Sequence, residues 1–232
     1  MHLTDPHTTR TIDGLFTSII HRHLSEQAEA WLQAKATAVK TEQGSMQLNM
    51  AFAQLPRMTT KAALQLKAEE VQEIDALMPG LSVTTWSIDQ LSRVWLLMQV
   101  PDADQDSYLK KINGLFIAAE MNELVALYAA LPLLSYSQEW AFRCTEGIRS
   151  NIGTVLEAIM YHNPYPFRYL PETAWNQLVL KAFFTEKDVE LIYGLMERNN
   201  KALQQTLKDY VEERDAAGRT INPWIHRLIK GQ

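Results

Sequence analysis

Apolar side chains recur along this chain at the spacing of an α-helix. The first such stripe starts at Ile12 and continues through Ile19 and Leu24 to Leu32. Residues three or four positions apart lie on one face of a helix, so this repeat predicts a helix with one buried face. The stripe indicates a first helix over residues 9–35, and similar stripes return through most of the sequence.

Further helices are expected wherever the same pattern returns between turn-forming residues. Their expected ranges are 47–55, 67–78, 88–100, 106–119, 122–131, 137–149, 151–161, 171–184, 186–197, 201–217 and 223–229. Gly44 indicates a loop over residues 40–45, and Pro56 is expected to end the helix before it. Residues 163–166 contain two prolines, which predict a rigid non-helical elbow there.

No segment carries a convincing strand pattern, so the chain is expected to be all-α. One domain is expected over residues 1–232. Two arrangements stay open: stacked antiparallel helix pairs in a HEAT- or armadillo-like superhelix, and a compact orthogonal bundle. A loose echo between residues 115–125 and 182–192 is what a stack would produce. Two unrelated amphipathic helices would produce it as well.

Charge and cysteine content limit the possible classes of function. The formal net charge is −5, which argues against a general nucleic-acid binder, since such a protein needs a basic face. The single cysteine, Cys144, cannot form an internal disulfide, which fits a reducing compartment. The first seven residues are polar, unlike a secretory leader. The apolar run 124–134 is too short to cross a bilayer. A cytoplasmic protein without direct membrane insertion is therefore expected.

The sequence lacks the common motifs of catalysis and cofactor binding. It has no Gly-rich phosphate loop, no cysteine pair for zinc, no His-Glu-x-x-His motif and no Gly-x-Ser-x-Gly elbow. Cys144 lies in an amphipathic stretch, where a packing role is expected rather than a nucleophile. We therefore expect no metal site and no cofactor, and we assign no catalytic residue.

Unusual polar residues begin at Glu146. If the helix continues through Asn151, then Glu146, Arg149 and Glu157 share one face with Gly153. Arg149 could then hold a carboxylate or a phosphate in a bidentate fork. The alternative is a solvated face with an ordinary i,i+3 ion pair, and the spacing alone favours that alternative.

Polar residues further along suggest either a binding surface or helix packing. His162 has a suitable side chain for acid–base chemistry, although an isolated histidine is more often structural. Asn176 lies toward an apolar face and should need a partner, in a ligand or at a neighbouring helix end. Residues 198–200 indicate a turn with helix-capping chemistry. The candidate ligand-binding residues are Glu146, Arg149, Asn151, Glu157, His162, Asn163, Asn176, Lys181 and Arg214.

Taken together in order and spacing, these motifs resemble the EboA family of bacterial proteins. The likeness rests on residues 146–151, residues 163–166, the Trp175-Asn176-Gln177 motif with Lys181, and Tyr210 with Glu213-Arg214. Residues 86–90 and 121–134 look similar too. The likeness spans about residues 52–228 and is strongest over 121–219. Phe183-Phe184 and the charged segment 185–188 depart from the family pattern.

The resemblance implies a role but no mechanism. EboA-type proteins are associated with making or moving a secondary-metabolite precursor, beside a membrane prenyltransferase and TIM-barrel enzymes that would be its partners. Three hypotheses follow: a non-catalytic helical scaffold or ligand-binding component, an enzyme acting on a polar or isoprenoid-linked metabolite, and a docking adaptor for the prenyltransferase. In the enzyme hypothesis, Arg149 would clamp an anion and Glu146 or Glu157 would act as acid or base.

Overall fold

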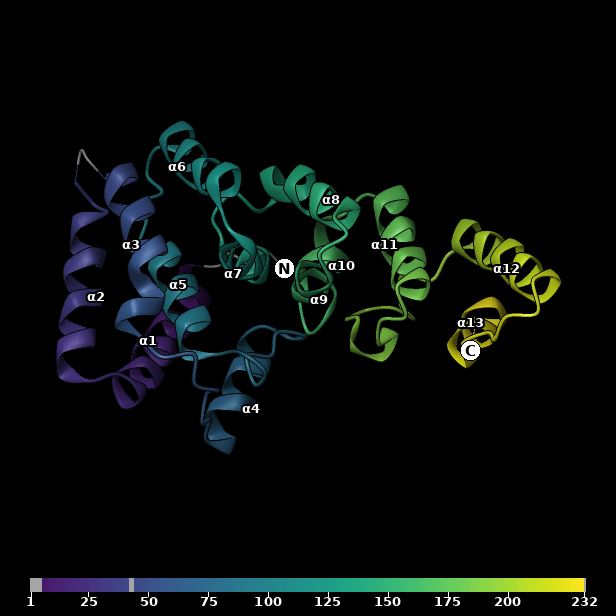
Figure 1. Ribbon diagram of the computed structural model, residues 1–232, viewed down its shortest axis with the longest axis horizontal. Helices are drawn as coiled ribbons and strands as arrows, with labels where there is room; N and C mark the ends of the chain where they lie inside the picture. Colours follow the sequence, from purple (N-terminus) through teal and green to yellow (C-terminus); the bar gives the residue numbers. More distant parts are fainter. Residues whose placement is uncertain (1–5, 42–43, 232) are drawn as a thin grey trace. The chain divides into compact units, whose positions relative to one another are not determined.

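The protein is all-α, as the helical spacing of its apolar residues predicts (Figure 1). A computed structural model describes residues 6–41 and 44–231. Within these ranges no strand forms, and β-type pairing of the backbone is limited to two isolated bridges. The chain divides into two compact units, Met1–Trp140 and Ala141–Gln232. The single domain and the superhelical stack remain predictions.

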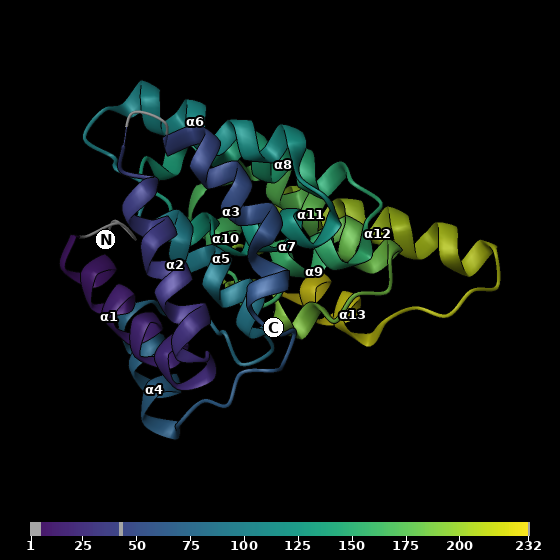
Figure 2. The ribbon, with the colours of Figure 1, turned by 60° about the vertical axis from the view of Figure 1, so that its left-hand side comes forward.

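The first unit is built around the helix α5 (Ile88–Met98), which contacts α1, α2, α3 and α7 (Figure 2). Nine of the eleven α5 residues are buried, among them the polar Asp89, Ser92 and Arg93. The other elements of this unit are α1 (Pro6–His23), α2 (Glu26–Ala38), α3 (Gly44–Met58), α4 (Ala68–Leu77), α6 (Gln105–Ala118), α7 (Met121–Ala129) and the 3-10 turns Leu131–Leu133 and Ser137–Trp140.

The single helix expected over residues 9–35 is wrong, because the chain forms α1 and α2 with a break between them. Ser25 has an extended backbone, and its hydroxyl accepts a hydrogen bond from the Ala28 amide at 3.3 Å. A serine in this position satisfies a free amide of the first turn and so starts a new helix. The apolar stripe continues across the break because both helices bury one face against the same core.

Pro56 does not end α3, which continues to Met58. A proline inside a helix leaves the carbonyl four residues earlier without its amide partner. Here that carbonyl belongs to Phe52, and the buried Arg93 of α5 donates Nε–H to it at 3.3 Å. Arg93 also pairs with Asp89 at 2.7 Å, and the two side chains are only 2% and 6% exposed. A contact from a distant helix therefore compensates for the proline.

The start of α3 also differs from expectation. The loop expected over residues 40–45 falls partly on 42–43, which lie outside the described residues, and α3 already begins at Gly44. The polar N-terminal segment that argued against a leader lies largely in residues 1–5, which are not described either.

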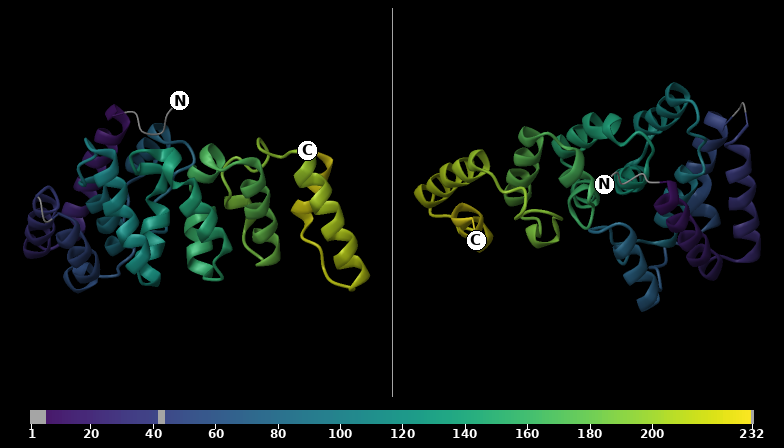
Figure 3. Two further views of the ribbon diagram at one scale, coloured as in Figure 1. Left: turned by 90° about the horizontal axis from the view of Figure 1, so that it is seen from above. Right: turned by 180° about the vertical axis from the view of Figure 1, so that it is seen from behind.

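The second unit consists of short consecutive helices that contact one another along the chain (Figure 3). Contacts join α8 to α9, α8 to α11, α11 to α12 and α12 to α13. Their bounds are α8 (Ala141–Arg149), α9 (Gly153–Met160), α10 (Tyr165–Tyr169), α11 (Glu172–Phe184), the 3-10 turn Val189–Leu191, α12 (Lys201–Ala216) and α13 (Pro223–Lys230). The unit buries Trp175, Tyr165 and Leu178.

Two predictions for this unit are wrong. The prolines at 163–166 do not exclude a helix, because α10 starts at Tyr165 and Pro166 occupies its first turn, where no amide bond is needed. Residues 186–197 form turns around Val189–Leu191 rather than a helix. Gly194 adopts φ +74°, and a Cβ atom there would overlap the ring of Phe167.

Candidate functional site

The proposed polar face from Glu146 to Glu157 does not form. The helix breaks between α8 and α9, so the condition for that face, a helix running through Asn151, is not met. The hydroxyl of Ser150 accepts a hydrogen bond from the Ile152 amide and starts the new turn. Glu146 and Arg149 form the ordinary i,i+3 pair, 3.5 Å apart, with side chains 45% and 64% exposed.

Glu157 and Asn151 instead form bridges to the region of α11. Glu157 accepts a hydrogen bond from Lys187 at 2.5 Å, and the Lys187 side chain is only 15% exposed. Lys181 donates to the Asn151 side chain at 2.9 Å. Both bonds join residues thirty positions apart, so they hold the α9 segment against the end of α11. Three of the candidates are thus used inside the unit.

His162 and Asn163 lie in the connection between α9 and α10. His162 has φ +49°, and its backbone amide donates to the Leu191 carbonyl at 2.9 Å. The Asn163 side chain is part of the core: it donates to the Ala158 carbonyl at 2.9 Å and accepts from the Tyr165 amide at 3.0 Å. One asparagine therefore satisfies the end of α9 and the beginning of α10.

Asn176 has the partner that its position predicts. Its side-chain amide and that of Asn200 exchange two hydrogen bonds, of 3.2 and 2.9 Å. The same Asn200 oxygen caps α12 by accepting from the Leu203 amide at 2.9 Å. The partner of Asn176 is therefore the residue that caps a neighbouring helix.

Arg198 is a key polar residue that the sequence pointed to only as part of a turn. Its Nη1 atom donates to the carbonyls of Pro166 and Phe167 at 3.0 and 2.8 Å, and Nη2 donates to that of Leu170 at 2.9 Å. The guanidinium carbon lies 4.8 Å from the Trp175 ring centroid. Burial lowers the pKa of this guanidinium. No local spacing could reveal this role, because all four partners lie more than twenty positions earlier.

Arg214 borders a cleft in the second unit. Its Nε and Nη2 atoms donate to the Thr220 carbonyl at 3.1 and 2.7 Å, and its guanidinium lies over the Tyr210 ring. The cleft has a volume of about 370 Å³ and is lined by residues of α11, α12, α13 and their connections. None of the other eight candidates lines it.

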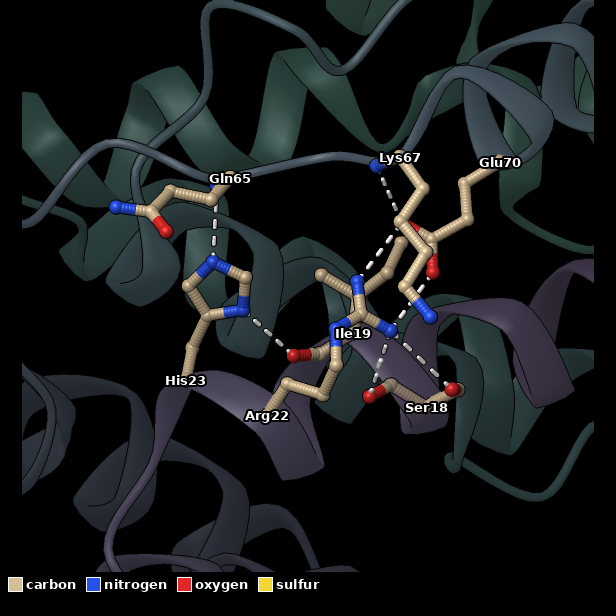
Figure 4. Close-up of polar contacts among 7 residues, drawn as sticks. All are labelled: Ser18, Ile19, Arg22, His23, Gln65, Lys67 and Glu70. Atoms are coloured by element: carbon tan, nitrogen blue, oxygen red, sulfur yellow. Dashed lines mark hydrogen bonds and ion pairs between the residues drawn. The ribbon is translucent and has the colours of Figure 1, made fainter.

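A second polar cluster, in the first unit, was not expected from the sequence (Figure 4). Arg22 of α1 holds both oxygens of Glu70 at 2.7 and 2.8 Å, and Glu70 also accepts from the Lys67 amide. His23 donates from Nδ1 to the Ile19 carbonyl and accepts at Nε2 from the backbone amide of Gln65. These bonds fix the start of α4 against α1.

These contacts determine the pKa of the Glu70 carboxyl group. Burial acts to raise its pKa, but the hydrogen bond and charge of Arg22 and the Lys67 amide outweigh burial, so the pKa lies below its usual value. Cys144 is also buried, and burial raises the pKa of its thiol far above the usual range. A protonated core thiol fits the expected packing role.

In the described part of the chain, no three His, Cys, Asp or Glu side chains gather closely enough to hold a metal ion. None of the helices within residues 6–41 and 44–231 has the length and hydrophobicity to span a bilayer. The run 124–134 forms α7 and a buried 3-10 turn, as expected.

The fold and these contacts define a class of protein: an all-helical protein whose unusual polar residues mainly cap and join its own helices. The chain belongs to the EboA family, described as metabolite traffic protein EboA, and the family model matches residues 12–230. The match extends further toward the N-terminus than the likeness over residues 52–228. No curated protein and no solved structure matches the chain.

Proposed function

We propose that this protein is a non-catalytic helical scaffold that binds a partner protein in the metabolite traffic for which its family is named. One observation carries the proposal. Four of the polar residues that carry the family resemblance bond to helix ends or to other side chains of the second unit: Asn151, Asn163, Asn176 and Lys181. A catalytic site needs groups that converge on a reacting atom, whereas these side chains form their bonds at different helix junctions.

The exposed face of α8 is the surface that we assign to the partner. Phe142, Glu146 and Arg149 follow one another at intervals of four and three positions, so they share a face of this helix. Phe142 is 65% exposed, which is unusual for so large an apolar side chain. Exposed aromatic residues beside an arginine are typical of the centre of a protein interface.

The partner that we propose is a protein encoded in the same gene cluster, such as the prenyltransferase or a TIM-barrel enzyme implied by the family resemblance. In this scheme the precursor is handled by the enzymes, and the helical protein holds them in position. The internal bonds of Asn163, Asn176 and Arg198 support the proposal, because a scaffold depends on a rigid arrangement of its helices.

Native mass spectrometry of the protein co-produced with the products of its neighbouring genes tests the proposal. We expect a complex with one of these proteins, and we expect Phe142→Ala to reduce the complexed fraction about tenfold or more. Ile117→Ala is the matched control, because Ile117 is the more exposed apolar residue, at 79%, and lies on α6. Both variants should keep the melting temperature of the parent protein.

A different result would contradict the proposal. If the protein carries a small molecule and no partner, and Arg149→Ala removes that molecule, then the α8 face is a ligand site. The scaffold function would then be abandoned in favour of the ligand-binding alternative.

A further inference from the structure

The cleft beside Arg214 has the chemical character of a small-molecule site. It has an apolar floor, formed by the buried Phe183, Tyr210 and Ile225. Its rim is polar and includes Glu186, Arg214, Thr220 and Asn222. A volume of about 370 Å³ lies within the range of small-ligand pockets. All of these residues belong to the second unit.

The two charged residues of the rim are not paired with each other. Across the described residues, neither Glu186 nor Arg214 forms an ion pair. The guanidinium is nevertheless held in place, by its two bonds to the Thr220 carbonyl and by the Tyr210 ring 5.7 Å from its central carbon. No described atom accepts a hydrogen bond from its Nη1 group, which remains available to a ligand.

The surroundings of Arg214 add further donors. Asn222 caps α13 through its side-chain oxygen, which accepts from the Trp224 amide, so its NH₂ group is not used in that bond. The N-terminus of α13 also contributes a partial positive charge near this side of the cleft. A carboxylate or phosphate is therefore favoured here. Glu186, held at φ +53° in the turn after α11, presents the opposite charge to the same cleft.

We propose that this cleft binds a small zwitterion with an apolar body, its anionic group at Arg214 and its ammonium group at Glu186. A simple anion would leave the Glu186 carboxylate unpaired at the rim, and a simple amine would do the same to Arg214. A zwitterion pairs both charges and places its apolar body on the floor of aromatic and aliphatic side chains. The inference does not depend on the scaffold function, because none of the cleft residues belongs to the exposed face of α8.

Three probes with the same aromatic body separate the contributions. They are L-phenylalanine, which carries both charges, 3-phenylpropionate, which carries only the carboxylate, and 2-phenylethylamine, which carries only the ammonium. A titration of the ¹⁵N-labelled full chain by NMR reports affinity through the amides of residues 220–225. We expect phenylalanine to bind about 10-fold or more tightly than either analogue, the effect of one charge-assisted hydrogen bond.

Two variants assign the charges. Arg214→Gln should lower the affinity for phenylalanine to about that for 2-phenylethylamine, and Glu186→Gln should lower it to about that for 3-phenylpropionate. Arg219→Gln and Glu197→Gln are controls outside the cleft lining and should leave the affinities unchanged. Circular dichroism and melting temperature report whether each variant is folded. Glu186→Gln tests the proposal even if Arg214→Gln is unstable, because Glu186 is exposed.

Several outcomes would overturn the proposal. Equal affinities for all three probes would mean that only the apolar floor binds. Equal affinities for phenylalanine and 3-phenylpropionate, with no effect of Glu186→Gln, would mean a site for anions alone. Absence of shifts in residues 220–225 with every probe would mean that the cleft binds none of these chemistries.

Discussion

At the scale of single residues, Arg198 joins α10 to the segment before α12 through three hydrogen bonds. Its guanidinium donates hydrogen bonds to three carbonyls at the end of α10 and lies over the Trp175 ring. Hydrogen bonds from a charged donor contribute about 1.5–3 kcal/mol each when buried, and partial exposure reduces this. The residue therefore acts as the C-terminal cap of a helix that is distant in sequence.

Arg198→Ala is expected to lower the free energy of unfolding by about 2–4 kcal/mol, measured by urea denaturation. Arg198→Lys should recover only a minor part, because an ammonium group cannot reproduce the planar fork. Arg219→Ala, at an exposed position, should change stability by less than about 0.5 kcal/mol. Equal effects of the two alanine substitutions would show that the carbonyl contacts of Arg198 contribute nothing.

Sequence spacing could predict some of these residue roles and not others. Asn176 was expected to need a partner because an amide on an apolar face is costly when unpaired, and Asn200 meets that need. The bonds of Arg198, and the bond from Arg93 to the Phe52 carbonyl, could not be assigned, because these acceptors come from helices far away in the sequence. Which of several possible acceptors an arginine finds is decided by tertiary packing.

At the scale of elements, short breaks determine where the polar residues point. The break at 150–152 separates α8 from α9, and Glu157 pairs with Lys187 rather than sharing a helix face with Arg149. The turn segment after α11 is likewise set by tertiary contact, because Gly194 lies against Phe167 at positive φ. Helix existence followed from the apolar stripes, but these breaks carry no equally clear local signal.

Gly194→Ala is expected to destabilise the protein by about 2–4 kcal/mol in urea denaturation, since it combines backbone strain with overlap on the Phe167 ring. Gly218→Ala is the matched control. Gly218 also has positive φ, at +63°, but a Cβ atom there meets nothing within 4 Å. Its cost should be the strain alone, about 1–2 kcal/mol. If both substitutions cost the same, the packing of Phe167 against Gly194 is not what shapes the segment.

The junction of α1 and α4 should make stability depend on pH. The pKa of Glu70 is lower in the folded state than its usual value of 4.5. Its contribution is therefore fully present above about pH 4.5 and is lost as the pH falls through the folded-state pKa. Glu70→Gln should be less stable than the parent near pH 7, and the difference should shrink below pH 4.5. A difference that stays constant down to pH 3 would contradict the role of Arg22.

At the scale of the whole molecule, the all-α class followed from periodicity, and the family match over residues 12–230 agrees with the resemblance carried by the polar motifs. The candidate residues were expected to form a binding surface or to serve helix packing. Five of them, Asn151, Glu157, Asn163, Asn176 and Lys181, form hydrogen bonds within the second unit, and Arg214 borders the cleft. Sequence order could place these residues in one segment but could not show that they belong to different helix junctions.

The most direct test of this account is the stability of alanine variants of two side-chain amides at helix junctions. Urea denaturation of Asn163→Ala and Asn176→Ala is expected to show a loss of about 1–3 kcal/mol each, since their partners at helix ends lose these hydrogen bonds. Residues retained for ligand binding often weaken the fold, so their removal leaves stability unchanged or raises it. Asn163 and Asn176 variants as stable as the parent, or more stable, would contradict the claim that these residues hold the helices together.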